Sequence, residues 1–204
     1  RMMEDAEIVI FEKGPFVSFA NCGLPYYISG EIAERDALLV QTPESLKARF
    51  NLDVRPFHEV VKISPEEHTV TVAHDGSEFT EQYDKLILSP GAKPFIPEIE
   101  GLSEGTNVFT LRNVPDLDQI MLALDEEPQE AVVIGAGFIG LETAENLRKR
   151  GLNVTIVEKA PHVLPPLDEE MAAFVQAELV DKGVKVITSQ SATRFEENGK
   201  AIVL

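Results

Sequence analysis

The sequence predicts an α/β fold built on parallel sheets, and three observations lead to this expectation. Short, nearly continuous apolar runs alternate with helical patterns, as they do where strands are buried on both faces of a sheet. A glycine-rich turn, VVIGAGFIG, joins one strand-like run to the helical pattern that follows it. Two of the strand-like runs, IVIFEK and VTIVEK, resemble each other and end in the same glutamate–lysine pair.

Composition limits the class of protein. The 204 residues suffice for one large domain or two small ones, and the formal charge of −17 makes the surface acidic. Nucleic acid and anionic membranes are not expected as partners, because their phosphates would be repelled. A single cysteine excludes an intramolecular disulfide, so a reducing cytoplasm is the expected location. The longest apolar run, AVVIGAGFIGL, is about half the length of a membrane-spanning helix.

The first half of the chain begins with AEIVIFEK, which predicts a buried parallel strand. Pro25 marks the start of a helix, and TPESLKARF predicts another helix that is capped by its threonine. The next stretch, residues 53–92, reads as several strands and includes a hairpin that turns at Asp75-Gly76. Its last run, DKLILSPGA, predicts one more strand, which ends in a glycine turn at Gly91.

The second half of the chain shows the alternation more clearly. VPDLDQIMLALDEE predicts an amphipathic helix, and Pro128 separates it from a new unit. That unit, EAVVIGAGFIGLETAENLRKRGLNVTIVEKA, reads as strand, glycine turn, helix and strand. LDEEMAAFVQAELVDKGVKVI adds a helix and a strand, and the final GKAIVL reads as a strand. We therefore expect a doubly wound domain with a parallel sheet.

The glycine turn fits the pattern G-x-G-x-x-G at Gly135, Gly137 and Gly140. The pattern alone is weak, but here a strand precedes it, a helix follows it, and Glu158 ends the next strand, as in a dinucleotide-binding fingerprint. Gly135 would permit the tight turn, Gly137 would let backbone N–H groups approach a pyrophosphate, and Gly140 would let the helix pack on the strand. The alternative is a glycine-rich turn without a ligand.

Two strand-end glutamates suggest two nucleotide sites. The Glu158 carboxylate would accept hydrogen bonds from ribose hydroxyls and repel a 2′-phosphate, which favours NADH over NADPH. The positive charge of Lys159 beside it would partly offset this repulsion. Glu12 stands in the equivalent place after IVIF. It predicts a second site, whose first strand and glycine loop we expect upstream of Arg1. The alternative is an ordinary glutamate at a strand end.

The only cysteine, Cys22, serves either to fill the core or as a chemical reagent. Three features favour a reagent: the helix start at Pro25, whose dipole favours a thiolate, the polar neighbours Ser18 and Asn21, and a hydride donor expected in the same protein. A thiolate beside a flavin can attack a disulfide or persulfide sulfur. The four histidines lack the spacing of a metal site, so no metal is expected: His58, His68, His74 and His162.

Together these elements resemble the flavin-dependent pyridine nucleotide–disulfide oxidoreductases over the whole chain. The strand ending in Glu12, then Cys22, then LILSPGAKP, the glycine loop and Glu158 follow one another in the order of that family. Tyr27 stands five positions after Cys22, where two-cysteine members carry a second thiol, so the pattern resembles the single-cysteine branch. SFANCGLPYYISG is most similar to coenzyme A–disulfide reductases and NADH-dependent persulfide reductases.

The resemblance implies roles for further residues. FAD would be bound by Glu12, Lys13, Val60 (or Val61), Ser89, Gly91 and Arg112. NADH would be bound by Gly135, Gly137, Ile139, Gly140, Glu142 and Glu158. Coenzyme A, a possible substrate or bound ligand, would be contacted by Ser18, Asn21 and Arg1. A lysine that some coenzyme A–disulfide reductases carry before HEVV is Phe50 here.

The implied fold consists of two Rossmann-like dinucleotide-binding domains, for FAD and NAD, with parallel central sheets. Residues 1–127 would be part of the FAD-binding domain, without its first glycine loop, and residues 128–204 part of the NAD(P)H-binding domain. The chain would thus be an internal fragment, inactive alone, of a homodimer that assembles through a C-terminal domain.

The implied enzyme is a flavoprotein that passes electrons from NADH through FAD to Cys22. From there they reach a small-molecule sulfur acceptor, which is a disulfide, polysulfide or persulfide such as coenzyme A disulfide. The alternative is an NADH oxidase or NADH peroxidase in which Cys22 becomes a sulfenic acid. A hypothesis of another class is a dinucleotide-binding module without catalytic activity.

Overall fold

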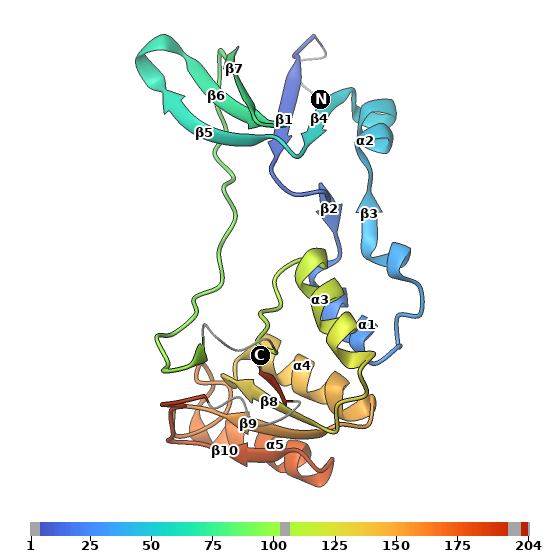
Figure 1. The fold of residues 1–204 in the computed structure, drawn as a ribbon, viewed down its shortest axis with the longest axis vertical. Coiled ribbons are helices and arrows are strands. Elements are labelled where there is room, and N and C mark those ends of the chain that lie inside the picture. Colours follow the sequence, from blue (N-terminus) through green and yellow to red (C-terminus); the bar gives the residue numbers. More distant parts are fainter. Residues whose placement is uncertain (1–4, 103–106, 196–200, 204) are drawn as a thin grey trace. The chain divides into compact units, whose positions relative to one another are not determined.

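The computed structural model describes residues 5–102, 107–195 and 201–203. The fold divides into two compact units (Figure 1). Unit 1 consists of residues 1–20 and 36–92, and unit 2 consists of residues 21–35 and 93–204. The domain boundary expected after residue 127 from the sequence stays a prediction.

Unit 1 begins with a parallel pair of strands. β1 (Ile8–Glu12) lies parallel beside β4 (Leu52–Pro56) along its whole length, so the expected parallel pairing is confirmed. The expected burial was wrong, because Ile8 and Ile10 are each 39% exposed and no described strand covers that side of β1. α2 (Pro43–Phe50) precedes β4 and packs on it. The Thr42 hydroxyl accepts a hydrogen bond from the N–H of Ser45 at 3.2 Å, so the expected helix cap is confirmed. β2 (Ser18–Phe19) and β3 (Leu39–Gln41) form a short antiparallel pair.

The rest of unit 1 is an antiparallel sheet of β5 (Glu59–Ser64), β6 (Thr69–His74) and β7 (Ser77–Gln82). The expected hairpin is confirmed. Asp75 and Gly76 both have positive φ angles, of 47° and 74°, which is the geometry of the turn that suits the twist of two antiparallel strands.

One expected strand is absent from the described structure. The run DKLILSPGA, at residues 84–92, forms no regular secondary structure, and Ile87 and Leu88 are 87% and 66% exposed. The expectation was wrong for a physical reason, because an apolar run becomes a strand only beside a partner that pairs its backbone groups. No strand of the described residues takes that place. Gly91, where a glycine turn was expected, has a φ of 72° but is not part of a regular turn.

Unit 2 contains a parallel sheet in the order β10-β9-β8-β11. Its strands are β8 (Glu130–Ile134), β9 (Asn153–Val157), β10 (Lys185–Ile187) and β11 (Ala201–Val203). Its longer helices are α3 (Val114–Leu124), α4 (Phe138–Lys149) and α5 (Glu169–Asp181). From β8 the chain proceeds outward to β9 and β10, then returns to the other side of β8. This reversal places a switch point, where α/β proteins bind ligands, at the carboxyl end of β8.

The segment around Cys22 belongs to unit 2. A 3₁₀ turn, η1 (Asn21–Gly23), leads into α1 (Leu24–Ile28), which has Pro25 in its first turn as expected. α1 packs against α3 and α4, as Figure 1 shows.

Two 3₁₀ turns lie elsewhere in the chain, η2 (Arg35–Leu38) and η3 (Pro65–Glu67). Within the described part of the chain, no helix has the length and apolar character needed to cross a membrane.

Candidate functional site

The glycine loop lies at the switch point of unit 2, between the end of β8 and the start of α4. Gly135 has a φ of 101°, and its N–H donates to the carbonyl oxygen of Val157 at 2.9 Å. Only glycine adopts this conformation without strain. Gly137 is the N-cap of α4, so the N–H groups in the first turn of that helix point toward its N-terminal end, where the loop lies. This arrangement suits an anion.

The glycines of the loop differ in how much space surrounds them. A Cβ atom at Gly137 or Gly135 would meet no atom within 4 Å, so the loop is open on that side. A Cβ atom at Gly140 would instead collide with the carbonyl oxygen of Gly135. The structure therefore distinguishes an open position, where a phosphate could approach the backbone, from a packing position, where helix and loop already touch.

Glu158 is buried at the end of β9, and both of its carboxylate oxygens accept backbone hydrogen bonds. Oε2 accepts from the N–H of Ala136 at 2.6 Å, and Oε1 accepts from the N–H of Ala160 at 2.7 Å. Glu158 thus holds the glycine loop in place as well as presenting a negative charge there. Each oxygen keeps a second lone pair, which a ribose hydroxyl could use.

Glu12 repeats part of this geometry in unit 1. Its Oε1 accepts a hydrogen bond from the N–H of Gly14 at 2.7 Å, two residues downstream, as Glu158 does from Ala160. The backbone N–H of His58, just before β5, donates to the carbonyl oxygen of Glu12 at 3.0 Å. Lys13 lies 3.7 Å from Glu59 in an exposed ion pair. The two strand-end glutamates therefore share the hydrogen bond from the N–H two residues downstream, in keeping with their similar sequences.

The other residues expected near FAD are spread over both units. In β5 an irregularity in the pairing occurs between Val60 and Lys62, and the side chains of Val60 and Val61 are both exposed. Ser89 and Gly91 lie in the irregular stretch of unit 1. Arg112 is in unit 2, directly before α3, where its backbone N–H donates to Asp116 at 2.8 Å. The structure thus groups Glu12, Lys13 and β5 by direct contacts.

Near the glycine loop, Ile139 lies in the first turn of α4 and is 59% exposed. Glu142, one turn further, is half-buried. The hydroxyl of Thr143 donates to the carbonyl oxygen of Ile139 at 2.7 Å, within the same helix. The side chain of Ile139 is therefore largely exposed in the first turn of the helix, while its carbonyl oxygen accepts a hydrogen bond within the helix.

Cys22 carries an exposed, free thiol in η1. Exposure does not suit a cysteine that serves only to fill a core. Asn21 beside it is also exposed, while Ser18 belongs to β2 of unit 1. α1, which follows Cys22, is five residues long, so its dipole is shorter than that of an ordinary helix. Arg1 lies outside the described residues.

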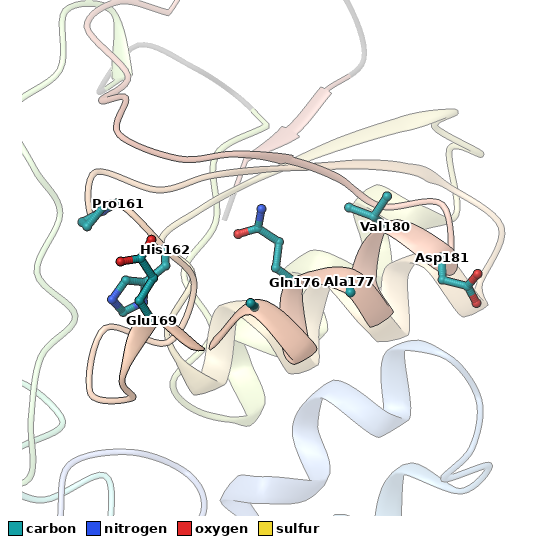
Figure 2. A pocket seen from close by; sticks show the side chains of 8 residues that line it. Pro161, His162, Glu169, Gln176, Ala177, Val180 and Asp181 are labelled. Atoms are coloured by element: carbon teal, nitrogen blue, oxygen red, sulfur yellow. The ribbon is translucent and has the colours of Figure 1, made fainter. Parts of the chain in front are cut away.

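A groove along α5 offers no alternative nucleotide site. Figure 2 shows Gln176, Val180 and Asp181 along the helix, with Pro161 and His162 contributed by the preceding connection. Glu169 and Asp181 are acidic, and none of the eight lining residues is Lys or Arg. A phosphate would therefore meet carboxylates without a compensating cation. Among the described residues, no cluster of His, Cys, Asp and Glu is arranged to hold a metal ion.

The family profile described as pyridine nucleotide-disulphide oxidoreductase matches residues 1–204. The chain belongs to this family. The family resemblance inferred from Glu12, Cys22, the glycine loop and Glu158 is therefore confirmed.

Named relatives of this family member match it over most of its length. It is 41% identical over 183 residues to a coenzyme A disulfide reductase of Staphylococcus haemolyticus, and the alignment covers 88% of this chain and 40% of the relative. It is 40% identical over 190 residues to an NADH oxidase of Methanocaldococcus jannaschii, and the alignment covers 92% of this chain and 42% of the relative. The chain therefore spans about two fifths of the length of the curated relatives it matches.

Solved structures agree in fold. Reduced Bacillus anthracis CoADR-RHD superposes with a TM-score of 0.96 and 48% identity, over 100% of this chain and 40% of that one. A NAD-dependent persulfide reductase from A. fulgidus superposes with a TM-score of 0.93 and 35% identity, over 98% of this chain and 41% of that one. The expected α/β fold with parallel sheets is confirmed.

Long-range hydrogen bonds hold the glycine loop and the segment around Cys22, and these bonds were not predicted from the sequence. Ala136 of the loop donates to Glu158, and Arg150 and Arg35 anchor the segment around Cys22. The bonded residues are between 22 and 122 positions apart. No local pattern reports such pairs.

Proposed function

We propose that the protein is an FAD-dependent reductase that passes electrons from NADH through Cys22 to a disulfide, polysulfide or persulfide. The observation that carries the proposal is the exposed thiol of Cys22, which lies in the same unit as the glycine loop. Relatives named for coenzyme A disulfide and for persulfide support this choice of acceptor. Coenzyme A disulfide is the first acceptor to test.

NADH would bind at the glycine loop. Its pyrophosphate would approach the open side of Gly137 and the N–H groups of the first turn of α4, with Ile139 and Glu142 nearby. Glu158 would accept hydrogen bonds from the adenosine ribose and repel a 2′-phosphate, so NADH would be preferred to NADPH. Because the carboxylate also holds Ala136, cofactor preference and loop conformation would depend on one side chain.

FAD would be bound by the residues that the resemblance implies. Glu12 would bind the adenosine ribose with Lys13 beside it, since its carboxylate accepts the same hydrogen bond from the N–H two residues downstream as that of Glu158. The exposed edge of β5 at Val60 would meet the adenine. The remaining contacts would come from Ser89, Gly91 and Arg112. When bound, FAD would accept two electrons from NADH and pass them on to sulfur.

Cys22 would carry out the sulfur chemistry. Its thiolate attacks one sulfur of the acceptor disulfide, forms a mixed disulfide and releases one thiolate. Two electrons and a proton then release the second thiol and restore the Cys22 thiolate. NADH, one proton and the disulfide are thus converted to NAD⁺ and two thiols. Ser18 and Asn21 would contact the thiol arm of coenzyme A, and a homodimer remains the expected assembly.

An NADH oxidase or NADH peroxidase is the second candidate, and the Methanocaldococcus relative supports it. In that reaction a peroxide would oxidise the exposed Cys22 to a sulfenic acid, which NADH would reduce again. Steady-state NADH oxidation with coenzyme A disulfide, a persulfide, hydrogen peroxide and oxygen separates the two candidates. We expect the highest kcat/KM with a sulfur acceptor, and a preference for oxygen or peroxide would favour the oxidase.

The test of the mechanism is Cys22→Ser in the full-length protein, with Cys22→Ala as a second variant. Both should abolish turnover with coenzyme A disulfide but leave flavin reduction by NADH nearly unchanged in stopped-flow measurements. Hydride transfer needs no thiol, whereas a serine hydroxyl cannot form a mixed disulfide. Turnover that survives in either variant would show that Cys22 is not the nucleophile.

A further inference from the structure

The segment that carries Cys22, residues 21–35, is attached to the helices of unit 2; we call it the cysteine segment. Leu24 and Ile28 of α1 are 2% and 0% exposed, and α1 packs against α3 and α4. A five-residue helix is too short to be stable alone, so its position depends on what holds it.

Arg150, directly after the last residue of α4, holds the end of α1. Its Nη1 donates to the carbonyl oxygen of Ile28 at 3.0 Å. The preceding carbonyls of the helix already have local partners, because Tyr26 accepts from Ile32 and Tyr27 from Gly30. The carbonyl oxygen of Ile28 is thus satisfied by a side chain 122 positions away, and the positive charge lies favourably at the helix C-terminus.

Two further contacts fix the same segment. Lys149 Nζ lies 3.2 Å from Glu31 and 2.9 Å from Glu145. Hydrogen bonds to Glu145 and Glu31 raise the pKa of Lys149, so its charge is retained. Arg35 makes a bidentate pair with Asp118 of α3, at 2.8 and 2.7 Å. The exposed lysine pair contributes little on its own, whereas the bidentate arginine pair fixes an orientation.

We propose that Arg150 is a positioning residue for Cys22, and this inference rests on the proposed function. α4 begins at the glycine loop and spans about 18 Å at 1.5 Å per residue. Its far end, through Arg150, holds the helix that follows Cys22. The same rigid element therefore carries the NADH site at one end and positions the thiol from the other. Loss of the Arg150 contact should loosen α1 and misplace the thiol without changing the glycine loop.

The experiment compares Arg150→Ala and Arg150→Lys with a matched control, Arg148→Ala, in the full-length protein. Arg148 also donates to backbone carbonyl oxygens, of Lys182 at 3.0 Å and Leu152 at 3.2 Å, but does not contact the cysteine segment. Three quantities are measured: the alkylation rate of Cys22 by iodoacetamide, the rate of flavin reduction by NADH, and kcat and KM for NADH with coenzyme A disulfide.

Arg150→Ala should change the alkylation rate at least about threefold and lower kcat about three- to tenfold, as expected for one lost charged hydrogen bond near the surface. KM for NADH and the flavin reduction rate should stay within about twofold. Arg150→Lys should restore most of kcat, because lysine can still donate to Ile28, and Arg148→Ala should leave both the alkylation rate and kcat near wild type.

Equal effects of Arg150→Ala and Arg148→Ala would overturn the proposal, as would a change in KM for NADH alone. Either result would leave the proposed function intact. Failure of the proposed function has a different signature, since Cys22→Ser would then keep its turnover with coenzyme A disulfide.

Discussion

Two glycines of the loop, three positions apart, should respond differently to alanine substitution, Gly140 in stability and Gly137 in NADH binding. In Gly140→Ala the new Cβ collides with the carbonyl oxygen of Gly135 and lies 3.4 Å from Val133 Cγ1, so α4 must move away from β8. Overpacking of this kind costs about 1–3 kcal/mol, and the better helix propensity of alanine returns up to about 1 kcal/mol. We expect a net loss of about 1–2 kcal/mol and a thermal midpoint lower by about 2–8 °C.

Gly137→Ala is the matched variant. Its φ of −77° suits any residue, and its Cβ would meet no atom within 4 Å. The poorer N-cap preference of alanine opposes the lower entropy of its unfolded chain, so stability should stay within about 1 kcal/mol of wild type. The methyl group would instead occupy the space expected for the pyrophosphate and raise KM for NADH about tenfold or more, the cost of one charged hydrogen bond.

The assays are thermal unfolding followed by circular dichroism and steady-state kinetics in the full-length protein. Gly140→Ala with wild-type stability would refute the inference of close packing. Gly137→Ala with wild-type affinity for NADH would refute the inference that the open side of the loop is the ligand side.

Three further predictions concern other positions. Glu158→Gln should raise KM for NADH about tenfold and reduce the preference over NADPH, because one of two backbone hydrogen bonds and the charge are lost; an unchanged cofactor ratio would contradict this. Gly76→Ala should destabilise unit 1 by about 1 kcal/mol, because its φ is 74°, and chemical denaturation measures the change. Cys22 should react with iodoacetamide in the native protein, as peptide mass spectrometry can report, and protection until unfolding would contradict its exposure.

Elements that depend on local chemistry were predictable from the sequence. The Asp75-Gly76 turn, the Thr42 cap and the glycine loop each follow from the conformations that a few adjacent residues prefer. Alternation of strands and helices then predicted the parallel sheet of unit 2, since parallel neighbours need a crossover connection. Motif spacing likewise identified Gly135, Gly137, Gly140 and Glu158 as one group.

Features that depend on partners far away in the sequence required the tertiary structure. The apolar run at residues 84–92 has the composition of a strand, yet composition cannot supply the neighbour that a strand needs. Glu158 was expected to meet a ribose, which stays a prediction, and the structure shows that it accepts a hydrogen bond from Ala136 of the loop. The sequence by itself identified the candidate groups, Cys22 among them, whereas long-range hydrogen bonds such as that from Arg150 to Ile28 were visible only in the tertiary structure. Such bonds follow from packing geometry, which has no signal in adjacent residues.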